Sequence, residues 1–205
     1  MESQLLVREG WVYSLGTYFP RSHREHWQSA ISQAVLWAKR GRQKEIEGFA
    51  VPIARFLNGW LPRMEPHIFT YVPGEPSPIT YLFSEMDWCS TRQLANAIFR
   101  HLDKTEWWTE ETLLTPARPK FMRQRDCKST AQRHANVQGQ YRVKHPDAVK
   151  GQNIVIVDDI VTSGATMDEC KRLLEDAGAK SVMGVALART VHKAWWPIEQ
   201  TALSC

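Results

Sequence analysis

Two adjacent carboxylates and a turn of small, hydroxyl-bearing residues lie within one short stretch of this chain. Asp158 and Asp159 follow the apolar run 154–157, and the turn begins after two further residues, Ile160 and Val161. The turn consists of Thr162, Ser163, Gly164, Ala165 and Thr166. Adjacent carboxylates repel each other unless a polar or cationic group compensates them, as sugar hydroxyls or a metal would. A turn that enters a helix presents backbone N–H groups to an anion, and a glycine lets the backbone approach a phosphate closely. The stretch therefore predicts a site for a sugar phosphate.

Simpler interpretations exist for the same residues. Thr166 and Glu169 have the spacing of a capping box, so helix capping alone would explain Thr166. Paired aspartates after an apolar strand also occur in metal-binding receiver domains and in other doubly wound folds. The chain contains neither Gly-x-x-x-x-Gly-Lys-Ser/Thr nor Gly-x-Gly-x-x-Gly. The interpretations as an ATPase or a dinucleotide-binding protein therefore lose their main support.

The segments around this stretch predict a parallel sheet. The β-branched run 154–157 is typical of a central parallel strand, which is buried on both faces. A helix is expected from about residue 166, with Gly178 at its end. Its inward residues are expected to be Met167, Cys170, Leu173, Leu174 and Ala177. Residues 181–188 form a second apolar strand, so the order is that of a βαβ unit. We therefore expect an α/β fold, a parallel sheet flanked by helices.

The first 65 residues have a different periodicity. Apolar residues recur at helical spacing over residues 27–38 and again over 46–60, which predicts two helices. Pro52 lies inside the second series and predicts a kink or a later helix start. From residue 67 onward, short strand-like runs alternate with helices. One of these helices is expected to open with Ser90-Thr91-Arg92-Gln93 as a capping box.

The composition limits the class of protein. The chain has 205 residues, enough for one α/β domain, and its hydrophobic fraction of 43% is ordinary for a globular protein. A net charge of +4 suits an anionic ligand but is too small to argue for nucleic-acid binding. The four cysteines form no Cys-x-x-Cys pair, which excludes a zinc ribbon by spacing and gives no disulfide framework. With no signal-peptide pattern and no apolar run near the ~20 residues of a membrane span, a cytoplasmic location is expected.

Residues 154–166 resemble the motif by which type I phosphoribosyltransferases bind 5-phosphoribosyl-1-diphosphate (PRPP). The pattern is four apolar residues, two acids, two variable positions and Thr-Ser-Gly-x-Thr. The resemblance implies that Asp158 and Asp159 hold the ribose hydroxyls and that residues 162–166 hold the 5-phosphate. It implies Mg²⁺ held through PRPP, with no direct protein ligand, and transfer of the phosphoribosyl group to a nitrogen nucleophile with release of diphosphate. Asp158 or Asp159 would position or deprotonate that nucleophile, and the acceptor stays open.

The wider chain resembles one branch of this family, the ComF-type competence phosphoribosyltransferases. Residues 133–141 are similar to the Arg-x-x-Asn-Val-x-Gly-x-Phe signature before the PRPP strand, and residues 93–95 to a region after the diphosphate loop. Residues 30–42 resemble the N-terminal helix of that branch. The branch's N-terminal Cys-x-x-Cys zinc finger is missing here. We expect a helical N-terminal extension, residues 1–65, packed on a phosphoribosyltransferase domain, residues 66–205.

Two other functions stay open beside the enzyme. One is a non-catalytic PRPP-binding module that assists DNA uptake in competence. The other is a nucleotide-modifying effector within a multi-protein system, for which the nine tryptophans allow a protein interface.

The segment 118–133 is strongly basic, with six Lys or Arg and one acid, Asp126. The resemblance implies a flexible hood that closes over the diphosphate, with Arg118 and Lys120 in the place of paired basic residues. Positive charge there would stabilise the departing diphosphate. A solvated loop is the plainer alternative. A nucleic-acid contact is also open but less favoured, because phosphate backbones select Lys and Arg as well.

Overall fold

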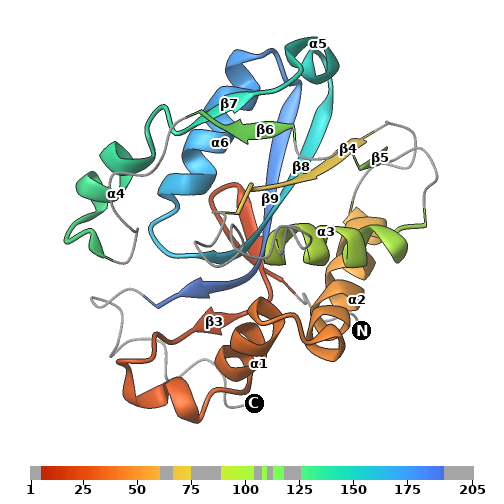
Figure 1. Ribbon diagram of the computed structural model, residues 1–205. Coiled ribbons are helices and arrows are strands. Elements are labelled where there is room, and N and C mark those ends of the chain that lie inside the picture. Colours follow the sequence, from red (N-terminus) through yellow and green to blue (C-terminus); the bar gives the residue numbers. More distant parts are fainter. Residues whose placement is uncertain are drawn as a thin grey trace, which may run out of the picture.

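The computed structural model describes residues 6–60, 67–74, 89–103, 108–109, 113–117 and 126–191. A seven-stranded sheet lies at its centre with helices on both faces (Figure 1). The sheet strands are β1 (Val7–Glu9), β2 (Val12–Ser14), β3 (Thr17–Tyr18), β4 (His67–Tyr71), β5 (Trp108–Thr109), β8 (Asn153–Val161) and β9 (Ser181–Thr190). The helices are η1 (Arg24–Trp27, a 3-10 helix), α1 (Ala30–Lys39), α2 (Gln43–Trp60), α3 (Ser90–Arg100), α4 (Thr130–Val137), α5 (Pro146–Val149) and α6 (Ala165–Asp176). A separate antiparallel pair joins β6 (Leu114–Pro116) and β7 (Tyr141–Val143).

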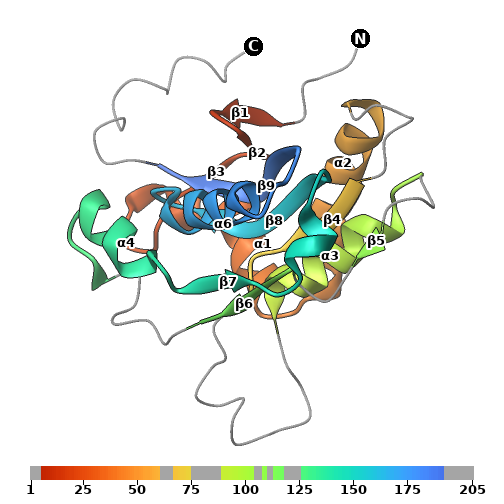
Figure 2. The ribbon, with the colours of Figure 1, turned by 90° about the horizontal axis from the view of Figure 1, so that it is seen from above.

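The strand order is β1-β2-β9-β8-β4-β5, and β3 pairs with β9 further along that strand. β1 and β5 therefore lie at opposite edges of the sheet (Figure 2). All pairs in this sheet are parallel except β1 with β2. The α/β fold predicted from the βαβ pattern, a parallel sheet flanked by helices, is confirmed.

β8 is the central strand of the sheet. It pairs with β9 on one side and with β4 on the other. The run 154–157 is at most 1% exposed, because helices cover both faces of the strand at this point. Burial on both faces explains why the run is continuously apolar instead of alternating.

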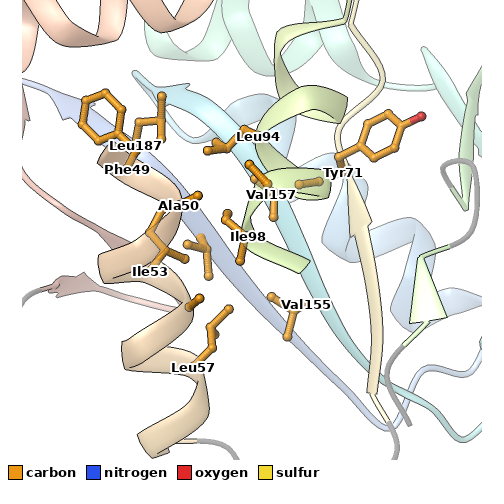
Figure 3. Packing of buried hydrophobic residues seen from close by; sticks show 14 of the residues in the cluster. Phe49, Ala50, Ile53, Leu57, Tyr71, Leu94, Ile98, Val155, Val157 and Leu187 are labelled. Atoms are coloured by element: carbon orange, nitrogen blue, oxygen red, sulfur yellow. The ribbon is translucent and has the colours of Figure 1, made fainter. Parts of the chain in front are cut away.

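Successive residues of the strands point to opposite faces and so enter two separate cores. On one face, Val155 and Val157 of β8 pack against residues of α2 and α3, among them Ile53 and Ile98 (Figure 3). On the other face, Ile154 and Ile156 pack in a cluster with residues of α6, which contributes Met167, Cys170 and Leu174. The predicted inward face of that helix is therefore confirmed for these three residues.

The first 65 residues are only partly helical. Two helices form close to the predicted ranges, as α1 and α2. The prediction of helix is wrong for the three short strands within residues 7–18, because β2 adds to the parallel sheet by pairing with β9. A later start of the second helix is also wrong, since α2 begins at Gln43 and includes Pro52. The division of the chain at residue 65 stays a prediction.

No helix in the ranges that the structure describes has both the length and the apolar character needed to cross a membrane.

Candidate functional site

The sheet contains a point at which its connections diverge, between β4 and β8. The chain leaves β4 toward α3, which packs in one core, and leaves β8 toward α6, which packs in the other. The strand after α3 is β5, at one edge, whereas the strand after α6 is β9, on the opposite side of β8. Open α/β sheets bind ligands beyond the carboxyl ends of the strands at such a divergence.

The acid pair lies at this point. The pairing of β4 with β8 ends at Tyr71 and Val157, and Asp158 is the next residue of β8. Beyond Val157, β8 continues to Val161, and within the described part of the chain β9 is its strand partner there. Asp158 and Asp159 are both partly exposed, although the residues before them are fully buried. The two carboxylates therefore stand where the sheet opens, within reach of a ligand from solvent.

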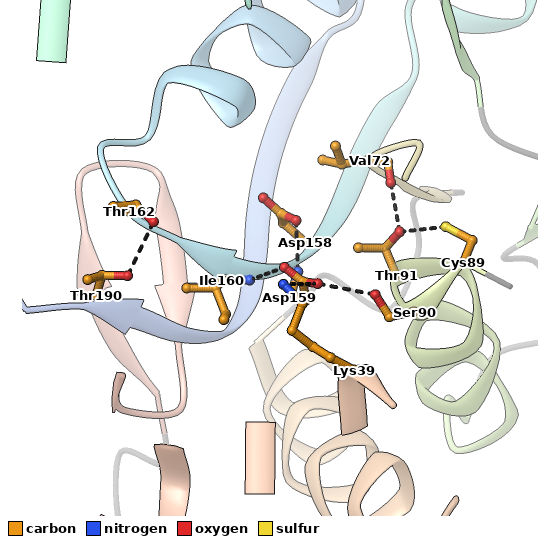
Figure 4. A network of polar contacts seen from close by, with 10 residues as sticks. All are labelled: Lys39, Val72, Cys89, Ser90, Thr91, Asp158, Asp159, Ile160, Thr162 and Thr190. Carbon is orange, nitrogen blue, oxygen red and sulfur yellow. Dashed lines mark hydrogen bonds and ion pairs between the residues drawn. The ribbon is translucent and has the colours of Figure 1, made fainter. Parts of the chain in front are cut away.

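The Asp159 carboxylate is held by three donors from different parts of the chain (Figure 4). Its Oδ2 lies 2.9 Å from Nζ of Lys39, the last residue of α1, and accepts a hydrogen bond of 3.1 Å from Oγ of Ser90, the first residue of α3. Its Oδ1 accepts from the backbone N–H of Ile160 at 2.6 Å. Asp158 contributes in turn, because its Oδ1 accepts from the backbone N–H of Asp159 at 2.8 Å.

Lys39 supplies positive charge beside the acid pair. Burial opposes that charge, but Asp159 and then Asp158 outweigh the effect of burial, so the pKa of Lys39 is raised above its ordinary value. Lys39 therefore stays protonated throughout the neutral range. Burial is also the main cause that raises the pKa of Tyr18 in β3, against the opposing effects of Lys39 and Arg21. Tyr18 is accordingly a neutral phenol close to this group of charges.

The predicted phosphate turn enters a helix, as its sequence indicates. Gly164 has φ 82° and ψ −12°, a left-handed conformation, and precedes the first residue of α6. A side chain at this position would be strained, and its Cβ would lie 3.3 Å from Oδ2 of Asp168. Ser163 Oγ accepts from the backbone N–H of Ala165 at 3.4 Å, while the Thr162 hydroxyl lies 3.2 Å from that of Thr190. A glycine, backbone donors and hydroxyls thus meet at the amino end of a 12-residue helix.

Neither predicted capping box forms. The cap residue of α6 is Gly164, which has no side chain to make a capping bond, and Glu169 accepts instead from the backbone N–H of Gly139 at 2.8 Å. Capping therefore does not explain the presence of Thr166. The cap residue of α3 is Cys89, which also makes no capping bond. The hydroxyl that was expected to cap α3, that of Ser90, donates to Asp159 instead.

The structure brings together the acid pair and the turn 162–166, which are joined by only two residues of β8. Arg118 and Lys120, the predicted hood residues, lie outside the described residues. The pattern of residue types did not identify Lys39 or Ser90 as partners of the acids. Lys39 resembled a basic residue that closes a helix, and Ser90 resembled a cap. The resemblance of residues 30–42 to the ComF-type branch includes Lys39 but assigned it no role. The resemblance of residues 93–95 begins three positions after Ser90 and does not include it.

The resemblance to the PRPP motif implies an Mg²⁺ ion that arrives with its ligand. Within the ranges that the structure covers, no group of three or more His, Cys, Asp or Glu side chains could hold a metal. Mg²⁺ in proteins is often held by one or two carboxylates together with substrate phosphates and waters. Asp158 and Asp159, beside the predicted phosphate turn, would lie close to an ion that is held through phosphates and waters.

Several known proteins resemble this chain over short segments. Competence protein ComFC of Streptococcus pneumoniae is 50% identical over 38 residues, which is 18% of this chain and 17% of that protein. DNA utilization protein YhgH of Escherichia coli O157:H7 is 41% identical over 59 residues, 29% of this chain and 25% of that protein. Adenine phosphoribosyltransferase of Treponema denticola is 38% identical over 45 residues, 22% of this chain and 24% of that protein. The matches thus span about a quarter or less of these relatives.

Two comparisons extend over more of the chain. A hypoxanthine phosphoribosyltransferase from Staphylococcus aureus aligns over 73% of this chain and 75% of its own, with 8% identity and a TM-score of 0.47. The family model of the phosphoribosyl transferase domain matches residues 93–205, more than half of the chain. That match includes the acid pair and the turn described above. The chain therefore belongs to the type I phosphoribosyltransferase family.

Proposed function

We propose that the protein binds PRPP with Mg²⁺ and transfers the phosphoribosyl group to a nitrogen nucleophile, releasing diphosphate. One observation carries the proposal. The acid pair stands where β4 and β8 diverge, and the same strand continues into a left-handed glycine at the amino end of α6. The carboxylates would accept hydrogen bonds from sugar hydroxyls, and the backbone donors of the turn would bind a phosphate. Only a few residues separate the two groups, so one ribose 5-phosphate would reach both.

The reaction needs little from the protein beyond placement and charge. A nitrogen–C1 bond forms, the C1–O bond to diphosphate breaks with its electron pair leaving on diphosphate, and the nucleophile loses a proton. Residues 162–166 hold the 5-phosphate through backbone N–H groups and hydroxyls, which fixes the position of the ribose. Asp158 and Asp159 accept from the ribose hydroxyls, and one of them positions the nucleophile or takes its proton. Charge on the diphosphate would be neutralised by Mg²⁺ when it is bound with PRPP.

The proposed role of the basic segment 118–133 is to stabilise the leaving group. We assign Arg118 and Lys120 to the hood, where their charges would stabilise diphosphate as it departs. We further propose a cytoplasmic location, because the four cysteines form no Cys-x-x-Cys pair and no disulfide framework by their spacing.

The test is turnover with a panel of acceptors. The protein is incubated with PRPP, Mg²⁺ and single purine, pyrimidine or other nitrogenous bases, and diphosphate release is measured. Release that depends on one base, and that disappears in the Asp158→Asn, Asp159→Asn double variant, supports the proposed enzyme. PRPP binding with no turnover for any base would contradict the transferase function.

A second candidate is a PRPP-binding module that serves DNA uptake or use without catalysis. The short matches to the competence protein and to the DNA utilization protein favour it. Saturable PRPP binding with no diphosphate release on the whole panel would support this candidate over the enzyme.

A further inference from the structure

The N-terminal part of the chain reaches the candidate PRPP site through a lysine. Lys39 lies 54 positions before residue 93, where the match to the family model begins. Its Nζ is nevertheless 2.9 Å from Oδ2 of Asp159, in the centre of that match. The second donor to this oxygen, Ser90, also lies outside the matched residues. Two residues that the family match does not cover therefore determine how an acid of the motif is placed.

The number of donors around Asp159 leaves room for a ligand. The two oxygens of a carboxylate offer about four acceptor positions in total. Lys39 and Ser90 occupy two positions at Oδ2, and the backbone N–H of Ile160 occupies one at Oδ1. Among the residues that the structure describes, these donors leave about one acceptor position, which is what a single sugar hydroxyl requires. The existing donors fix the plane of the carboxylate and hence the direction of that last position.

The ion pair has little to contribute to the fold itself. The Lys39 side chain keeps 40% of its surface exposed, against 15% for Asp159. Ion pairs with an exposed partner add little to folding stability, because water screens them and because the long side chain loses freedom. The contact between Lys39 and Asp159 matters for ligand binding instead. Without it, two adjacent carboxylates would repel a ligand that carries several negative charges. A lysine at this point offsets that repulsion.

We propose that Lys39 is a positioning residue of the PRPP site. It acts through Asp159, by orienting this carboxylate toward a ribose hydroxyl and by compensating its charge. This inference rests on the proposed function, and it adds α1 to the PRPP site although α1 lies outside the match to the family.

The experiment measures binding by calorimetry with two probes, PRPP with Mg²⁺ and ribose 5-phosphate. Lys39→Met is compared with Lys44→Met, which removes the same charge from an exposed position on α2. We expect Lys39→Met to weaken both probes by about ten-fold or more, the loss typical of a charge-assisted contact. Lys39→Arg restores most of the affinity, and Lys44→Met binds as the wild type does. Melting temperatures report folding, and Lys39→Gln replaces Lys39→Met should the latter not fold.

The route through Asp159 is tested by coupling the two substitutions. In the Asp159→Asn background, Lys39→Met is expected to have no further effect, because the oxygen that the lysine holds has lost its charge. A loss that persists in that background would overturn the proposal in favour of a direct contact with the ligand. So would a loss confined to PRPP, which alone has the diphosphate, or an affinity equal to that of the wild type. A wild type that binds neither probe would instead contradict the proposed function.

Discussion

The two halves of the candidate site are built in different ways. The phosphate turn is made from its own residues, because Gly164 adopts the left-handed conformation and the helix that follows supplies the N–H groups. The acid pair depends on distant parts of the chain, since Asp159 takes donors from α1 and α3 as well as from its own strand. A turn of the first kind is visible in a short sequence motif. An acid pair of the second kind is recognisable in sequence, but its partners are not.

Because of this difference, PRPP binding should respond to substitutions in the two halves of the site in different ways. Substitutions in the turn act where they are made, through backbone conformation and access of the phosphate. Substitutions around the acid pair act at a distance, and the size of each effect depends on how many donors remain. The following variants test the contrast, beginning with the largest expected effect on PRPP binding.

Removing both charges of the acid pair gives the largest effect. In Asp158→Asn, Asp159→Asn, PRPP binding with Mg²⁺ is expected to fall by at least about 100-fold, because each hydrogen bond to a charged group contributes about 1.5–3 kcal/mol. The fold is retained, and relief of the repulsion between the acids allows an unchanged or higher melting temperature. Calorimetry and thermal melts measure the two effects. Affinity equal to that of the wild type would mean that the acids do not bind the ribose.

A side chain in the turn gives the next effect. Gly164→Val forces a β-branched residue into φ 82°, which costs about 1–2 kcal/mol of stability or more, and blocks the approach of the 5-phosphate. Binding of ribose 5-phosphate is expected to fall strongly, although by less than in the double acid variant, while the protein still folds at a reduced melting temperature. Gly48→Val is the matched control, because nothing lies within 4 Å of a Cβ at that helical position. Retained affinity in Gly164→Val would exclude the turn as the phosphate site.

Ser90 is expected to give a smaller effect of the long-range kind. Ser90→Ala removes one of the three donors to Asp159 and leaves Lys39 in place. Because Lys39 and the backbone N–H of Ile160 still hold the carboxylate, PRPP affinity should fall by only about three- to ten-fold, less than the loss of a full hydrogen bond to a charged group. Ser181→Ala is the control, since Ser181 bonds to Asn153 at 2.7 Å at the opposite end of the same strands. Equal losses in the two variants would show that the effect is not specific to the acid pair.

The smallest effect on PRPP binding is expected for a substitution away from the site, at the contact of α2 with α3. Hydrogen bonds from His101, Arg100 and Gln43 lower the pKa of Glu47 from 4.5 to about 2. Because the pKa is lower in the folded state, the stabilisation is present above pH 4.5 and is lost as the pH falls toward 2. Glu47→Gln should therefore cost less than about 1 kcal/mol near neutral pH. Denaturant titrations of both proteins should converge in acid, and PRPP affinity should not change.

The parts of the structure that follow from local pattern were predictable. The buried strand, the glycine turn, the inward face of α6 and the parallel sheet all depend on residues within one βαβ segment. The strands β1 to β3 were missed because they are only two or three residues long, and because the pairing of β2 and β3 with β9 spans most of the chain. The roles of Lys39 and Ser90 were missed for the same physical reason. A lysine at the end of a helix and a serine at the start of one both have ordinary local roles, as a charge and as a cap. Only tertiary packing brings Lys39 and Ser90 into contact with Asp159.

The central claim is that the acid pair and the turn together bind PRPP. Titration of the folded wild-type protein with PRPP, with and without Mg²⁺, tests it most directly by calorimetry. We expect saturable binding of one PRPP per chain that is clearly tighter with Mg²⁺. No heat of binding with PRPP and Mg²⁺, on protein shown by its melting curve to be folded, would contradict the claim.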